Sequence, residues 1–239
     1  MQHPLDNPIW SALKGPNAGF CIGQGDALHF QRDVTPFSAI SEHSDAAYAD
    51  LAVHLPAGEM ARMFRPGMEP LPAGWEHIQD FPLLQMVATR FDVAASSPGV
   101  EIHTLSDTDL PEIMALVSST EPGPFGARTI KLGRYVGVYE GGSMIAMAGE
   151  RMRVPGYVEL SAICTAPEAR GRGLAAMLVQ HLMKIASENG EIPFLHVVES
   201  NQPAITLYEK LGFSLRKKLH VLRRKPMRPS AETERLQPC

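Results

Sequence analysis

The chain has 239 residues, of which 44% are hydrophobic and 20% charged, so it is long enough for one large domain or two small ones. Its net charge of -4 argues against a surface built throughout for nucleic acid. Cys21, Cys164 and Cys239 are widely spaced, so neither a disulfide framework nor a zinc cluster is indicated. No signal peptide and no bilayer-spanning apolar run is visible, and we expect a soluble cytoplasmic protein.

The first part of the chain carries weak patterns. Residues 20–22 and 28–30 flank the turn sequence GQGD and predict a hairpin, residues 44–54 predict a helix, and several short strands are expected up to residue 87. No motif in this part indicates chemistry. The sequence AASSPG at 94–99 is typical of a linker. We therefore expect an N-terminal accessory domain over 1–98, a second domain over 99–225 and a flexible tail over 226–239.

The second domain shows a clear succession of elements. Ser106 and Asp109 form a capping-box pattern that predicts the start of a helix, Gly141-Gly142 predicts a hairpin turn, and Asn189-Gly190 predicts the end of a helix. The expected strands are 101–104, 135–140, 144–153, 158–165, 194–198 and 213–222, and the expected helices begin near 106, 172 and 203. This order predicts an α/β (α+β) fold in which helices flank a mixed sheet.

The stretch CTAPEARGRGLA at 164–175 joins an expected strand to an expected helix. Glycines allow the free amides of a helix start to approach a phosphate, and the two arginines add positive charge. A tight turn with surface arginines is the simpler interpretation. A P-loop is excluded because no Lys-Ser or Lys-Thr follows the glycines. Gly171, Gly173 and Ala176 formally meet a dinucleotide fingerprint, but the preceding strands do not form the βαβ units that it requires.

Two motifs stand out in the second domain. Arg170, Gly173 and Ala175 match the pattern Q/R-x-x-G-x-G/A, and residues 201–213, NQPAITLYEKLGF, match N-x-x-A-x-x-L-Y-x-x-L-G-F. Together these motifs resemble those of the GNAT superfamily of acyl-CoA-dependent N-acetyltransferases. The resemblance covers about residues 101–224 and implies a mostly antiparallel GNAT sheet flanked by helices. In some members a degenerate copy of the fold precedes the catalytic domain, and we expect this of residues 1–98.

The resemblance implies acetyl-CoA as cosubstrate, with its pyrophosphate on the glycine turn and its pantetheine along the preceding strand. Tyr208 matches the tyrosine that donates a proton to the coenzyme sulfur, although a packed helix tyrosine is the alternative. Asn201 matches an asparagine that holds the pantetheine or caps a helix. Cys164 is expected to be a small packed side chain. The implied cofactor-binding residues are Ile163, Cys164, Thr165, Arg170, Gly171, Arg172, Gly173, Leu174, Ala175, Asn201 and Tyr208.

The base for the attacking amine has two main candidates. Glu159 lies eleven residues before Arg170, where histone-acetyltransferase-type members carry a glutamate base. His196 stands where ribosomal-protein acetyltransferases carry a glutamate, so the sequence departs from that pattern. Glu150 and Glu199 are weaker candidates, and water carries the proton in many members of the superfamily.

These observations predict transfer of an acetyl group to a primary amine of a small molecule, a peptide or a protein. The alternative is a non-catalytic acyl-CoA sensor or regulatory module, and a dinucleotide-binding oxidoreductase is a weaker rival. The histidines lack metal-ligand spacing, so no metal is expected. We expect a monomer or homodimer with no nucleic-acid or membrane partner. The basic residues 216–228 are interpreted as a charged edge strand with a loose terminus, or as contacts to the 3′-phosphate of coenzyme A.

Overall fold

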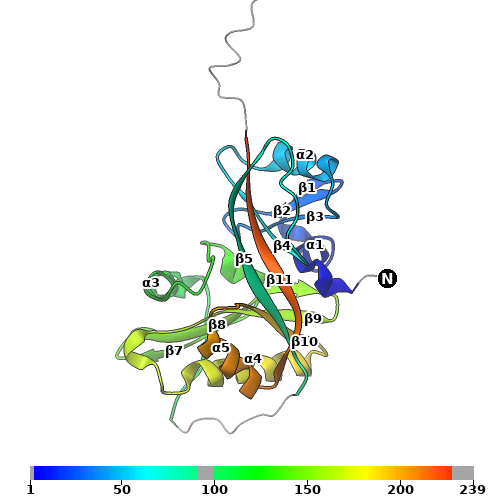
Figure 1. Cartoon of the computed structure of the whole chain (residues 1–239). Helices are drawn as coiled ribbons and strands as arrows, with labels where there is room; N and C mark the ends of the chain where they lie inside the picture. Colours follow the sequence, from blue (N-terminus) through cyan, green and yellow to red (C-terminus); the bar gives the residue numbers. More distant parts are fainter. Residues whose placement is uncertain (1–2, 91–98, 228–239) are drawn as a thin grey trace, which may run out of the picture.

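The computed structural model describes residues 3–90 and 99–227 (Figure 1). The strands of the N-terminal part are β1 (Cys21–Gln24), β2 (Ala27–Phe30), β3 (Ser38–Ile40), β4 (Ala61–Arg65) and β5 (Trp75–Ala88). Those of the second part are β6 (His103–Thr104), β7 (Tyr135–Glu140), β8 (Ser143–Val154), β9 (Tyr157–Thr165), β10 (Ile192–Val198) and β11 (Phe213–Pro226). The α-helices are α1 (Pro8–Leu13), α2 (Asp45–His54), α3 (Leu110–Thr120), α4 (Leu174–Glu188) and α5 (Gln202–Lys210).

Eight strands form one sheet in the order β4-β11-β5-β10-β9-β8-β7-β6, and β1, β2 and β3 form a second, smaller sheet. Only β9 and β10 pair in parallel; the other described pairs are antiparallel. The predicted fold class is therefore confirmed. The capping box is also present, because the Ser106 amide donates to the Asp109 carboxylate at 2.8 Å.

The main sheet crosses the predicted boundary at residue 98. β5 lies between β10 and β11, and β4 pairs with the other edge of β11 (Figure 1). Two expectations are wrong as a result. The short strands expected up to residue 87 include one strand of 14 residues, and β11 is an interior strand instead of an edge strand. That residues 1–98 and 99–225 are separate domains stays a prediction. Most of the expected linker and tail lies outside the described residues.

Alternate residues of β10 show that the sheet separates two cores, because neighbouring side chains of a strand point to opposite faces. Leu195 and Val197 join the core that includes α3, α4 and α5. Phe194 joins a second core, which includes α1 and parts of β4 and β11. Residues of the N-terminal part thus cover one face of the sheet, and helices of the second part cover the other.

β9 and β10 separate along their length. They pair only from Tyr157 opposite Ile192 to Glu159 opposite Phe194. On its other edge β9 carries an irregularity between Ser161 and Cys164, where Ala162 has a φ of 52°. A residue with a side chain is disfavoured in this left-handed region, and a bulge bends its strand. The last part of β9 is therefore left without a strand partner on the β10 side.

Candidate active site

A cavity of about 880 Å³ opens where β9 and β10 separate. Its lining combines the glycine turn, the last part of β9, the end of β10 and the start of α5 with residues of the N-terminal part. A volume of this size is typical of a small-molecule site. Of the predicted cofactor-binding residues, all except Arg172 line the cavity: Ile163, Cys164, Thr165, Arg170, Gly171, Gly173, Leu174, Ala175, Asn201 and Tyr208.

The glycine turn presents bare backbone at the start of α4. Gly171 and Gly173 both have a φ of 76°, which favours glycine, and no atom lies within 4 Å of a Cβ built on either. Gly173 is the N-cap of α4 and offers no side chain to the first amides of the helix. These amides lack intrahelical acceptors and lie at the positive end of the helix dipole. The turn therefore has the features of an anion site.

The two arginines of the turn have different surroundings. Arg170 lines the cavity, and its Nε donates to the carbonyl of Thr165 at 3.5 Å. Arg172 is exposed and forms a double ion pair with Glu140 at the tip of the β7–β8 hairpin, at 2.8 and 3.0 Å. The Arg172 side chain is thus committed to the hairpin, and its part in cofactor binding stays a prediction.

Tyr208 and Asn201 come from α5 and its N-terminus. The Tyr208 side chain is 8% exposed, and burial raises the pKa of its phenol to about 12. It is therefore protonated near neutral pH and able to donate a proton. The Asn201 side chain accepts a hydrogen bond from the Ala204 amide at 3.3 Å, which makes it the N-cap of α5. Burial raises the pKa of the Cys164 thiol, consistent with the expected packing role.

Glu159 is fully buried and does not line the cavity. Arg151 donates to both of its carboxylate oxygens, at 2.9 and 2.6 Å, and His196 Nδ1 lies 2.7 Å from Oε1. Burial raises the pKa of this carboxyl, but Arg151 and His196 outweigh burial and lower it to about 2. Such a carboxylate is a weak base whose oxygens are already occupied.

His196 lines the cavity and is held from both ring nitrogens. Gln85 Nε2 lies 3.1 Å from His196 Nε2 and also donates to the Leu5 carbonyl, while Gln85 Oε1 accepts from Arg216. The carbonyl can only accept and the guanidinium can only donate, so the Gln85 amide donates to His196 Nε2. His196 Nε2 is thus the acceptor, and Nδ1–H donates to Glu159.

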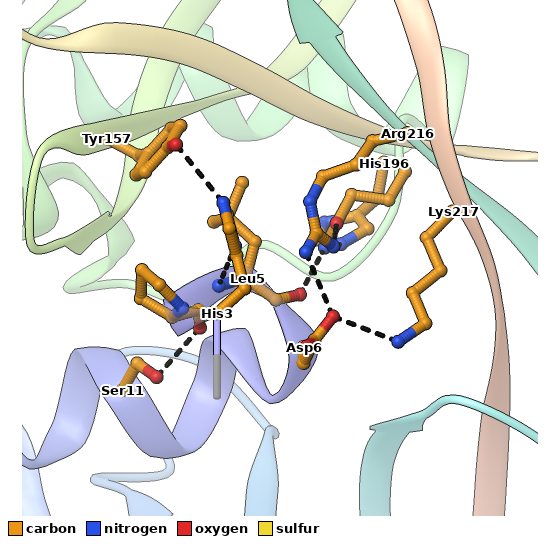
Figure 2. Close-up of polar contacts among 10 residues, drawn as sticks. His3, Leu5, Asp6, Ser11, Tyr157, His196, Arg216 and Lys217 are labelled. Carbon is orange, nitrogen blue, oxygen red and sulfur yellow. Dashed lines mark hydrogen bonds and ion pairs between the residues drawn. The ribbon is translucent and has the colours of Figure 1, made fainter. Parts of the chain in front are cut away.

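Residues 3–6 contact the strands on either side of this site. Asp6 accepts hydrogen bonds from Arg216 and Lys217, both at 2.9 Å, and Figure 2 shows these two side chains converging on it. His3 Nε2 lies 3.2 Å from the Tyr157 hydroxyl, and Figure 2 marks this contact with a dashed line. Residues 3–6 therefore anchor the N-terminal segment to β9 and β11.

The weaker base candidates lie outside the cavity lining. Glu150 is buried and accepts hydrogen bonds from Arg153 at 2.6 Å and from the Arg134 amide at 3.1 Å. Glu199 is exposed and paired with Lys218 at 2.8 Å. Neither position supports a direct role in the cavity.

The sequence led us to expect that the N-terminal part closes one side of the substrate site, but it did not indicate which residues do so. Phe37, Arg62, Phe64, Phe81 and Leu83 line the cavity, together with Arg151 of β8 and Val221 and Arg223 of β11. Arg62 and Phe64 are alternate residues of β4 in the sequence ARMFR, but nothing in that sequence indicates which strand β4 pairs with.

Within residues 3–90 and 99–227, no group of three or more His, Cys, Asp and Glu side chains is placed to hold a metal ion. No helix in these ranges is long and apolar enough to cross a bilayer.

Comparisons with known proteins agree with this geometry. A family model described as FR47-like protein matches residues 135–222. Among solved structures, an acetyltransferase of the GNAT family from Novosphingobium aromaticivorans DSM 12444 is 38% identical, with a TM-score of 0.86; the match covers 94% of this chain and 99% of that chain. A GCN5-related N-acetyltransferase from Kribbella flavida shares the fold over 98% and 99% of the two chains, at 18% identity and a TM-score of 0.65.

Two curated relatives match shorter segments. The N-acetyltransferase YobR of Bacillus subtilis is 38% identical over 78 residues, and the mycothiol acetyltransferase of Corynebacterium jeikeium is 41% identical over 70 residues. These matches cover 32% and 28% of this chain, and 31% and 19% of the relatives. The identity to the N. aromaticivorans protein, in contrast, extends over nearly the whole of both chains, and this protein is a member of the GNAT family of acetyltransferases.

Proposed function

We propose that the protein transfers an acetyl group from acetyl-CoA to a primary amine by direct attack, without a covalent enzyme intermediate. The observation that carries the proposal is the continuity of the cavity. The glycine turn, the unpaired part of β9, Tyr208 and His196 all line one space. Family membership supports acetyl transfer in general, and the cavity supports the assignment of roles.

The residues present fit acetyl-CoA. The free amides at the start of α4 suit a pyrophosphate, and the backbone of Ile163 to Thr165 is open to an extended pantetheine where β10 has separated from β9. Bound acetyl-CoA supplies a thioester carbon that a neutral amine attacks, so that a C–N bond forms while the C–S bond breaks. The protein must then accept one proton from the amine and deliver one to the sulfur.

Tyr208 is our candidate for the acid. It lines the cavity, and burial keeps its phenol protonated because the pKa is raised to about 12. Within the described residues, no hydrogen bond occupies its hydroxyl. Its proton is therefore available to the leaving sulfur.

His196 is a better candidate for the base than Glu159, because His196 lines the cavity and Glu159 does not. His196 Nε2 is the nitrogen that would take the proton, and it now accepts the hydrogen bond from Gln85. Glu159 would act as a positioning residue that holds Nδ1–H and balances the imidazolium. Gln85→Leu removes the hydrogen bond to His196 Nε2 and should change the transfer rate if His196 is the base. An unchanged rate would favour water as the proton acceptor.

The test of the proposed function is thiol release from acetyl-CoA with a panel of amines, with coenzyme A binding followed by calorimetry. Release that depends on an amine supports the transferase. Tight binding without turnover on any amine would instead support the acyl-CoA sensor.

A further inference from the structure

Two arginines face the cavity from neighbouring strands. Arg62 of β4 and Arg223 of β11 are directly opposite each other in the strand register, and both line the cavity. Phe64 and Val221 line it two residues away on the same strands, as the alternation of side chains requires. We call Arg62 and Arg223 the arginine pair.

The arginine pair has no acidic partner within 4 Å in the part of the chain that the structure describes. Both Nε atoms are buried without a hydrogen-bond partner there. Arg223 donates to the neutral Gln79 side chain at 2.9 Å and lies over the Phe81 ring at 5.2 Å. The adjacent Arg224 shows the contrast, because it is buried and forms a double ion pair with Asp80. Arg151, also in the cavity lining, is neutralised by Glu159.

Two like charges at directly opposite positions of neighbouring strands repel each other and destabilise the pairing of the two strands. Burial, and to a smaller extent the positive charge of Arg223, lower the pKa of Arg62. The negative charge of Glu59 acts in the opposite direction and raises it. Guanidinium groups present donors that match the oxygens of a carboxylate or a phosphate. Free donors and uncompensated positive charge on a cavity wall thus fit an anionic oxygen group of a ligand.

We propose that the acceptor amine carries a carboxylate or phosphate group that binds the arginine pair. This inference rests on the proposed function. Phe64 contacts the His196 ring, with 4.8 Å between ring centroids, and Arg62 lies two residues before Phe64 on β4, a step of about 7 Å. The anionic group is therefore separated from the reacting amine by an apolar segment, which packs against Phe64 and Phe81. Small ω-amino carboxylates have this form, whereas the α-amino and carboxylate groups of one amino acid are too close together.

The experiment compares thiol release for straight-chain ω-amino carboxylates, from glycine to aminooctanoate, with alkylamines of equal length. Aminoalkyl phosphates form a third arm that distinguishes the two anions. The variants are Arg62→Gln and Arg223→Gln, with Lys184→Gln as the control, since Lys184 is an exposed cation of α4 outside the cavity lining. Binding of aminohexanoate to the protein saturated with coenzyme A is measured by calorimetry, so that the inference is tested without turnover.

We expect the longer amino carboxylates or phosphates to be preferred over alkylamines. Each arginine variant should reduce that preference, and the affinity for aminohexanoate or its phosphate counterpart, by about 10- to 100-fold, whereas Lys184→Gln should not. Equal rates for charged and neutral amines would overturn the inference and leave the transferase standing. If the arginine variants also lost affinity for coenzyme A, the inference would be overturned, and the arginine pair would be assigned to binding of the coenzyme phosphates. Calorimetric binding that depends on the pair, without thiol release from any amine, would overturn the proposed function alone.

Discussion

Substitution of Glu159 by Gln tests the buried cluster beside the cavity. The change removes the only negative charge that pairs with Arg151 in the described part of the chain, where two hydrogen bonds of 2.9 and 2.6 Å join them. Arg151 is itself buried, so it would keep an uncompensated charge inside the protein. Breaking a buried ion pair by removing one partner costs about 3–5 kcal/mol. At about 2–4 °C per kcal/mol for a chain of this size, we expect Tm to fall by roughly 6–20 °C.

The assay is thermal unfolding, followed by circular dichroism at several pH values. Glu199→Gln is the control, because it removes an exposed carboxylate paired with Lys218 and should cost less than about 1 kcal/mol. The pKa of Glu159 falls from its ordinary 4.5 to about 2 in the folded protein. Its stabilising contribution is therefore complete above pH 4.5 and lost as the pH falls toward 2. Across this window the Tm difference between the natural protein and Glu159→Gln should shrink.

A Tm loss no larger than that of Glu199→Gln would refute this reasoning. So would a Tm difference that stays constant from neutral pH down to pH 2. The double variant Arg151→Met, Glu159→Gln provides a further check, because it leaves no unpaired charge. It should lose less stability than the sum of the two single variants.

Three further predictions concern single side chains. Tyr208→Phe should lower kcat by roughly 100-fold or more while coenzyme A affinity measured by calorimetry is retained, and an unchanged kcat would remove Tyr208 as the acid. Gly149→Ala should destabilise the fold by about 1–3 kcal/mol in urea unfolding, because its Cβ would lie 2.1 Å from the Tyr135 ring. Gly19→Ala, with open space around its Cβ, is the matched control and should have little effect. Gly173→Ala should strain a φ of 76°, costing about 1–2 kcal/mol, and weaken coenzyme A binding in calorimetry; equal affinity would argue against the glycine turn as the pyrophosphate site.

Much of the second part of the chain was predictable because its signals are local. The capping box of Ser106 and Asp109, the Gly141-Gly142 hairpin turn and the helix end at Asn189-Gly190 depend on neighbouring residues, and all are present in the structure. The motifs around Gly173 and Asn201 predicted the family, which the comparisons confirm. The cavity lining brings these two motifs together.

The position of the N-terminal strands was not predictable in this way. β5 and β10 pair through residues more than a hundred positions apart in sequence, and β4 pairs with β11 at a greater separation. Strand alternation shows which residues share a face, but it does not show which strand lies alongside. The expectation of β11 as an edge strand was wrong for this reason.

The sequence by itself determined the fold class, the glycine turn and the family, because each follows from short-range patterns. Tertiary structure alone decided which residues surround Glu159 and which two arginines lie opposite each other on the cavity wall. Glu159 is a plausible base until Arg151 and His196 are seen to occupy its oxygens. Arg62 and Arg223 are ordinary charged residues until the sheet places them opposite each other on the cavity wall. The chemistry of both depends on burial and on neighbours distant in sequence, which exist only once the sheet has formed.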